Sequence, residues 1–143
     1  MENIKEEIIV VEIVFWKDKG KQQITIDLFS VKAEEIIKSI SFKDNRGNEK
    51  RELDKNQIRR FYNDVVVISS KINNAKDKEL EFEKQLPYLN MINAKVAYSK
   101  ARKLITGDNF SDYIKKSIQQ VNDLDDFKVF CSLFESVIAY FGK

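Results

Sequence analysis

Histidine is absent from the 143 residues, and cysteine and proline each occur once. Without histidine there is no imidazole to act as a general base, to activate a serine or cysteine nucleophile, or to bind a metal. The single cysteine, Cys131, excludes a disulfide framework and fits a reducing cytoplasm. These absences exclude histidine-based and multi-cysteine chemistry, and no spacing singles out a pair of catalytic carboxylates, so we expect no catalytic residues, no metal site and no cofactor.

Glycine is scarce as well, with four residues, and an all-β fold uses glycine and proline in its turns. The hydrophobic fraction is 43%, which is enough for a buried core at a length typical of one domain. We therefore expect a mainly all-α fold.

Neither sign of charge dominates, because 25 basic residues are balanced by 23 acidic ones. The positive charge is local: residues 95–116 hold six basic and two acidic side chains. Nucleic-acid contact requires such a local excess, although solvated helix surfaces show it too. The apolar run from Ile8 to Trp16 is interrupted by Glu12 and too short to span a bilayer. We expect a cytoplasmic protein without membrane contact.

Residues 1–52 are predicted to form an N-terminal arm. A β-branched and aromatic run ends at Trp16, a turn signal covers residues 17–20, and residues 23–28 alternate with period two, which predicts a β-hairpin. A short helix is expected over residues 31–41, and the polar stretch 43–52 is predicted to be a mobile linker. Because the hairpin is too apolar to remain in water, we expect it to pack on the helical body or on a partner, such as a second copy.

Residues 53–143 are predicted to form a small antiparallel helical bundle. Asp54 and Gln57 form a capping box at the start of the first helix, which ends near Asn73 and Asn74. Several apolar residues then recur at steps of three and four, which is the pattern of an amphipathic helix. The short connections between helices favour antiparallel neighbours.

The second helical region is expected to begin near Asp77. Pro87 either kinks this helix or restarts it, after which it runs to Ile105 with Gly107 as its stop. The two helices that follow are expected to be capped by Asp108 or Asn109 and by Asn122 or Asp123.

Two features that resemble chemical sites are expected to be structural. Cys131 lies in the apolar stripe of the last helix, where a free thiol behaves as a small hydrophobic residue. Asp123, Asp125 and Asp126 stand where a helix begins and lack the glycine turn of a calcium loop. They are expected to cap that helix rather than to bind a cation.

One basic and aromatic pattern points to a binding function. Lys95, Tyr98 and Arg102 are three and four residues apart, which places two cations and a phenol on one helix face. The neighbouring cations are Arg59, Arg60 and Lys100. Such a face suits nucleic-acid phosphates. The alternative is that Tyr98 is a core residue and the cations are solvated edge residues whose stems cover apolar surface.

Three segments resemble a known family. The first is residues 54–62, DKNQIRRFY, which look like the helix-opening signature of the small subunit of type III-A CRISPR effector complexes. The second is residues 130–140, FCSLFESVIAY, which are similar to the closing motif of that family. The third is residues 95–102, KVAYSKAR, which resemble its central basic helix, with Ala94 where the family has a proline. The resemblance covers about residues 53–142.

This resemblance implies a non-catalytic, all-helical scaffold subunit that stacks in copies along a ribonucleoprotein. Its partners would be guide RNA, target RNA and the other effector subunits. The RNA-binding positions would map to Arg59, Lys95 and Arg102, with Arg60 and Lys100 as neighbours, through contacts to phosphate that do not depend on sequence. Two alternatives remain: a helical protein–protein interaction module or adaptor without direct RNA contact, and a small hydrolase that works through carboxylates.

Overall fold

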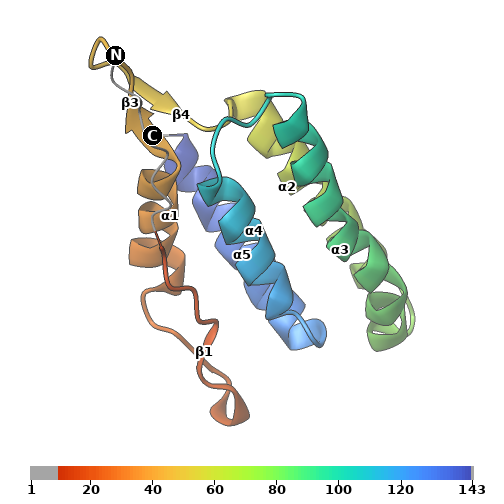
Figure 1. Cartoon of the computed structure of the whole chain (residues 1–143). Helices are drawn as coiled ribbons and strands as arrows, with labels where there is room; N and C mark the ends of the chain where they lie inside the picture. Colours follow the sequence, from red (N-terminus) through yellow and green to blue (C-terminus); the bar gives the residue numbers. More distant parts are fainter. Residues whose placement is uncertain (1–9, 143) are drawn as a thin grey trace.

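Five α-helices dominate the computed structural model, which describes residues 10–142 (Figure 1). They are α1 (Ala33–Ser39), α2 (Lys55–Asn73), α3 (Lys78–Ala101), α4 (Asn109–Gln119) and α5 (Leu124–Phe141). Two small antiparallel sheets lie in the N-terminal part, one formed by β1 (Trp16–Asp18) and β2 (Gln23–Ile24) and the other by β3 (Ser41–Lys43) and β4 (Glu49–Arg51). The mainly all-α fold expected from the sequence is confirmed.

The predicted N-terminal hairpin is present but short. Trp16 of β1 pairs with Ile24 of β2 across a 3-10 turn, Lys19–Lys21. Within the preceding extended segment Val11, Ile13 and Phe15 are buried. Residues 8 and 9, the start of the predicted strand, lie outside the described residues. The arm therefore packs on the helical body of its own chain, one of the two arrangements expected.

The short helix expected over residues 31–41 is also present. A π-helical turn, Leu28–Lys32, leads directly into α1. Both segments contribute to the core, because Leu28, Ala33, Ile36 and Ile40 have 0% of their surface exposed.

The polar stretch 43–52, predicted to be a linker, instead forms the β3–β4 hairpin, with Ser41 opposite Arg51. The carboxylate of Asp44 accepts hydrogen bonds from the backbone N–H groups of Arg46 and Asn48, both at 2.9 Å. Gly47 has φ 78°, a left-handed conformation that glycine adopts without a steric penalty. The sequence shows no alternation of apolar and polar residues here, because most of this hairpin is exposed and no apolar face of it packs on the core.

Three of the predicted helix starts are confirmed by their caps. The Asp54 carboxylate accepts from the backbone N–H of Gln57 at 2.9 Å, and that of Asp123 accepts from the N–H of Asp126 at 2.8 Å. Asp77 accepts from the N–H of Leu80 at 3.0 Å, and α3 then continues through Pro87 without a restart.

The predicted end of α3 is wrong. The helix stops at Ala101 rather than near Ile105, because Lys103 adopts a left-handed conformation with φ 63°. The backbone N–H of Leu104 donates to the carbonyl of Ser99 at 2.9 Å, which closes the helix end. A lysine, not Gly107, therefore makes the turn.

Gly107 has a different role, which involves the buried side chain of Glu52. The Glu52 carboxylate accepts from the backbone N–H groups of Asn109 at 3.2 Å and Phe110 at 2.9 Å, and so caps α4. Asp108 occupies the cap position but forms no side-chain cap bond there. A Cβ on Gly107 would overlap the Glu52 carboxylate. The cap of α4 thus comes from a residue 57 positions earlier in the chain.

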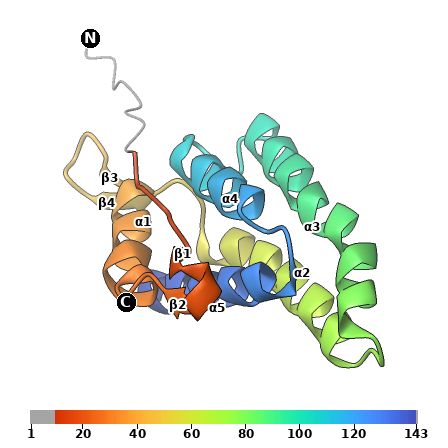
Figure 2. The same cartoon turned by 90° about the horizontal axis from the view of Figure 1, so that it is seen from below.

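The helices pack in a ring (Figure 2): α2 lies against α3, α3 against α4, α4 against α1, α1 against α5, and α5 against α2. The consecutive helices α4 and α5 meet through aromatic side chains rather than through a close approach of their backbones. Aromatic rings fill the space between them, with Tyr113 edge-to-face on Phe134 at a centroid distance of 5.8 Å. This arrangement leaves α2 and α3 together at one side of the molecule.

Candidate nucleic-acid interface

A groove of about 750 Å³ runs between α2 and α3 and collects several of the predicted residues. Arg60 lines it from α2, and Lys95, Tyr98 and Arg102 line it from α3. One face of α2 is buried in the core through Ile58, Phe61 and Val65. Arg60 and Asp64 lie on a neighbouring face of the same helix and line the groove. The groove therefore follows from the amphipathic spacing of both helices.

Tyr98 is 63% exposed, so the alternative that this residue belongs to the core is wrong. Its hydroxyl accepts a hydrogen bond from the Arg102 guanidinium at 3.1 Å, and the same guanidinium lies 5.5 Å from the ring centroid. These contacts hold one cation and one aromatic ring together one turn apart on the surface of α3.

One acidic side chain lies in the groove. The Lys95 ammonium is 3.2 Å from the Asp64 carboxylate, and both side chains are substantially exposed. An exposed ion pair of this kind contributes little to stability and exchanges readily for another anion. Among the described residues neither Arg60 nor Arg102 forms an ion pair with a carboxylate. The groove consequently keeps positive charge.

The other two predicted residues lie outside this groove. Arg59 is exposed one position before Arg60, and consecutive helix positions differ by about 100° in direction. Lys100 forms an ion pair with Asp108 at the start of α4. The structure therefore brings together three of the five predicted cations.

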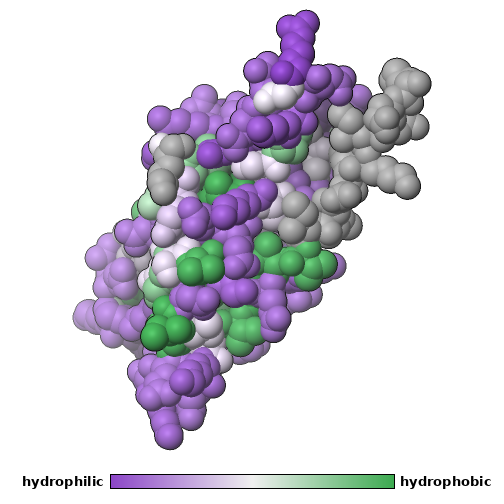
Figure 3. All heavy atoms as spheres, turned by 90° about the vertical axis from the view of Figure 1, so that its left-hand side faces the viewer, coloured by the Kyte–Doolittle hydropathy of each residue, from purple (hydrophilic) through white to green (hydrophobic). Residues whose placement is uncertain are grey.

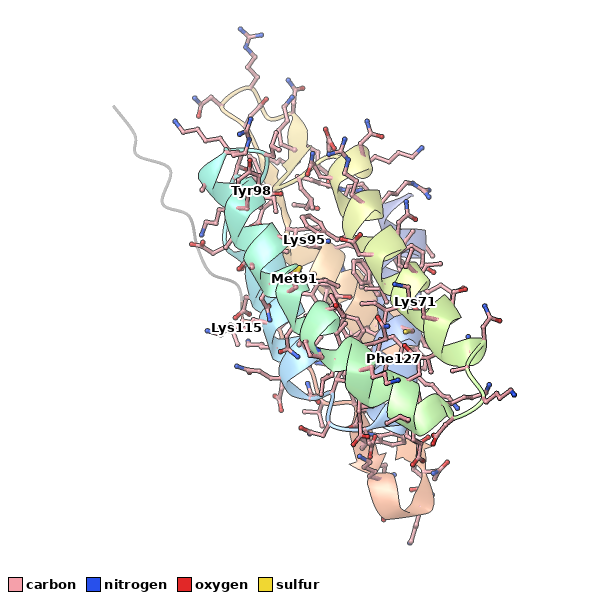
Figure 4. All side chains as sticks on the ribbon, turned by 90° about the vertical axis from the view of Figure 1, so that its right-hand side faces the viewer. Lys71, Met91, Lys95, Tyr98, Lys115 and Phe127 are labelled. Atoms are coloured by element: carbon pink, nitrogen blue, oxygen red, sulfur yellow. The ribbon has the colours of Figure 1, made fainter. Side chains whose placement is uncertain are left out.

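Two further exposed residues, which were not predicted from the sequence, lie along the same line of α3. Tyr88 is 57% exposed and Met91 is 46% exposed. Figure 4 shows Tyr98, Lys95 and Met91 following one another along α3 on the side that faces the viewer. The spacing 88, 91, 95, 98 and 102 repeats steps of three and four, which is the signal that identifies this line.

A second groove, between α2 and α5, contains Cys131 together with Ser69 and Glu135. Burial raises the pKa of the Cys131 thiol to about 12, despite a hydrogen bond with Ser69, so the thiolate is scarce at neutral pH. This agrees with the structural role expected for Cys131.

The acidic cluster at the start of α5 has its own partners. Asp123 caps the helix and also pairs with the ammonium of Lys19 at 2.6 Å. Asp126 accepts from the indole N–H of Trp16 at 2.8 Å, from the N–H of Asn122 at 2.9 Å and from Lys19 at 2.9 Å. Burial raises the pKa of Asp126, but these donors outweigh it and hold the pKa below its usual value. The cluster attaches the N-terminal arm to α5.

Residues 10–142 include no group of three metal-ligating side chains placed to hold an ion. Within the same range, each α-helix is too short or too polar to cross a membrane.

The fold and the groove define a class of small, mainly α-helical proteins with a basic, aromatic surface on a ring of helices. A comparison with protein families makes the assignment specific: the family Csm2 Type III-A matches residues 31–142, and the chain belongs to this family. The chain is thus a subunit of type III-A CRISPR effector complexes, with the other subunits as partners. Searches of curated proteins and of solved structures found no match.

The family match also extends the resemblance seen in the sequence. It begins at residue 31 rather than near residue 53, and it includes α1 and the β3–β4 hairpin. The segment predicted to be a linker is therefore part of the family fold.

Proposed function

We propose that this chain is a non-catalytic RNA-binding scaffold of the type III-A ribonucleoprotein, and that the α2–α3 groove holds guide and target RNA through contacts to phosphate. The observation that carries this proposal is that Arg60 and Arg102 line one groove without any ion-pair partner among residues 10–142. Guanidinium groups bind phosphate oxygens in a bidentate geometry, which makes them suitable for this contact.

Phosphate contacts carry no sequence information, and a subunit that must accept targets of any sequence requires this indifference. Lys95 contributes when it exchanges Asp64 for phosphate, since their ion pair is exposed. Arg59, which is exposed next to Arg60, and Lys100, which would exchange Asp108 for phosphate, are further candidate contacts outside the groove. Several copies in one complex would add the avidity that a single groove lacks.

Self-association in the cytoplasm, as stacked copies or a dimer, is the second part of the proposal. The N-terminal part exposes Val14, Ile26 and Val31, and Ile26 is 98% exposed. Figure 3, which shows the α1 side of the molecule, displays hydrophobic surface gathered among polar residues. This face also favours the second candidate function, a protein-docking adaptor without direct RNA contact.

The test is the salt dependence of RNA binding by the assembled complex. Replacing Lys95 and Arg102 with alanine should weaken binding equally for unrelated RNA sequences. The log-log slope of affinity against salt should fall by about 0.7 for each single-strand phosphate contact removed. Lys128→Ala, an exposed lysine on α5, is the matched control and should change neither quantity. Unchanged affinity and slope in the double variant would favour the adaptor instead.

A further inference from the structure

A line of exposed side chains along α3 combines aromatic rings, an apolar group and cations. Tyr88, Met91, Lys95, Tyr98 and Arg102 occupy it in that order, and both tyrosines have more than half of their surface exposed. Single exposed hydrophobic residues are common on proteins and require no explanation. Here, however, the exposed residues follow one another at steps of three and four along one helix. They form a continuous surface of two tyrosines, a methionine and two cations.

The charge around this line selects the kind of partner. From Lys84 to Gly107 the chain has five basic residues and no acidic one. The one carboxylate in the groove is that of Asp64, on α2. A protein partner would have to supply several acids to neutralise these cations on burial, because unpaired buried charges are costly. A polyanion with flat apolar groups can neutralise the cations and also stack on the aromatic rings.

Resting on the proposed function, we propose that Tyr98 and Tyr88 are stacking platforms for unpaired bases, so that this face binds single-stranded RNA more tightly than a duplex, which it contacts through phosphate alone. Aromatic side chains bind single strands because every base offers a face to stack on, whatever its identity. In a duplex the faces of internal bases are already covered by their neighbours, and the rings gain nothing there.

The geometry of α3 agrees with a strand that lies along the helix. Tyr88 and Tyr98 are ten residues apart, which corresponds to about 15 Å at 1.5 Å per residue. This exceeds the roughly 3.4 Å between adjacent stacked bases, so the two rings contact different bases of one strand. Lys95 lies between the rings and Arg102 lies one turn beyond Tyr98, where they meet intervening phosphates. The hydrogen bond from Arg102 to the Tyr98 hydroxyl restricts the ring before RNA arrives.

The experiment measures fluorescence anisotropy of the full chain with two probes: a labelled uridine-rich 15-mer and the same strand annealed to its complement. Tyr98→Leu should weaken binding of the single strand about tenfold and leave binding of the duplex unchanged. Tyr98→Phe keeps the ring and should stay within about twofold of the parent chain. Tyr88→Leu should act in the same direction as Tyr98→Leu. Phe42→Leu, at an aromatic residue 43% exposed on β3, is the matched control and should have no effect.

The outcomes separate this inference from the function on which it rests. If Tyr98→Leu binds both probes like the parent chain while the Lys95 and Arg102 double variant loses both, the phosphate contacts stand and stacking is refuted. Equal losses for Tyr98→Phe and Tyr98→Leu would assign the effect to the hydroxyl and would also overturn stacking. If the double variant loses neither probe, the RNA-binding function itself fails.

Discussion

The N-terminal part of the molecule, residues 10–52, and the helices α2–α5 build the same core by different means. In α2–α5, stripes of apolar residues and a series of packed rings hold the helices together, for example Tyr62 of α2 on Phe134 of α5 at a centroid distance of 5.4 Å. The N-terminal part also buries large residues, but polar side chains fix its position: Trp16 and Lys19 bind Asp126, and Glu52 caps α4. Burial of periodic apolar residues stabilises the helices α2–α5. A few polar contacts determine where the N-terminal part attaches to them.

The largest expected effect comes from removing the N-terminal part altogether. A chain that begins at Leu53 loses Phe15, Leu28, Ile36 and Ile40, each less than 2% exposed. Fully burying one such side chain contributes about 2 kcal/mol, so the four together approach the whole net stability of a typical domain. We expect no cooperative thermal unfolding by circular dichroism. A sharp transition at the temperature of the full chain would show that residues 53–143 fold as an independent domain.

An intermediate effect is expected for the polar contact between the two regions at Glu52. Glu52→Ala leaves the N–H groups of Asn109 and Phe110 without their acceptor in a buried position. We expect a loss of about 3 kcal/mol in the free energy of unfolding, measured in urea. Glu49→Ala, at an exposed glutamate on the same hairpin, should change it little. Equal stabilities for the two variants would contradict the capping role.

A smaller and pH-dependent effect is expected for Asp126→Asn. This change weakens the attachment of the arm and should cost about 1 to 2 kcal/mol at neutral pH. Because the pKa of Asp126 is lowered in the folded protein, its stabilisation is present above the unfolded value near 3.9 and is lost as the pH falls through the folded value. The parent chain should therefore lose more stability below about pH 4 than the variant does.

Two natural probes show which region responds to Asp126→Asn. Trp16, the one tryptophan, reports on the arm through its fluorescence, and Cys131, the one cysteine, reports on the α2–α5 side through its reactivity with a thiol reagent. In acid we expect a change in Trp16 emission before far-ultraviolet circular dichroism detects loss of helix. At neutral pH Cys131 should stay slow to react. Glu12→Gln, at an exposed acid of the arm itself, is the matched control, and an equal effect there would refute the specific role of Asp126.

Most of the helices, and the positions of the basic residues along them, can be predicted from local sequence alone. The caps at Asp54, Asp77 and Asp123 and the line of Lys95, Tyr98 and Arg102 depend on residues within one or two helical turns of each other. Local spacing is sufficient for such features, because a helix places residues three and four apart on one face whatever its surroundings.

Tertiary structure decided what depends on residues far apart in the chain. Glu52 caps α4, Lys100 pairs with Asp108 on another helix, and Arg60 meets Lys95 and Arg102 in one groove because α2 lies against α3. The exposure of Tyr98, which distinguishes a surface ring from a core ring, also follows from which helices surround it. Spacing along one helix defines a face but not what that face meets, since the packing of the other helices determines its neighbours.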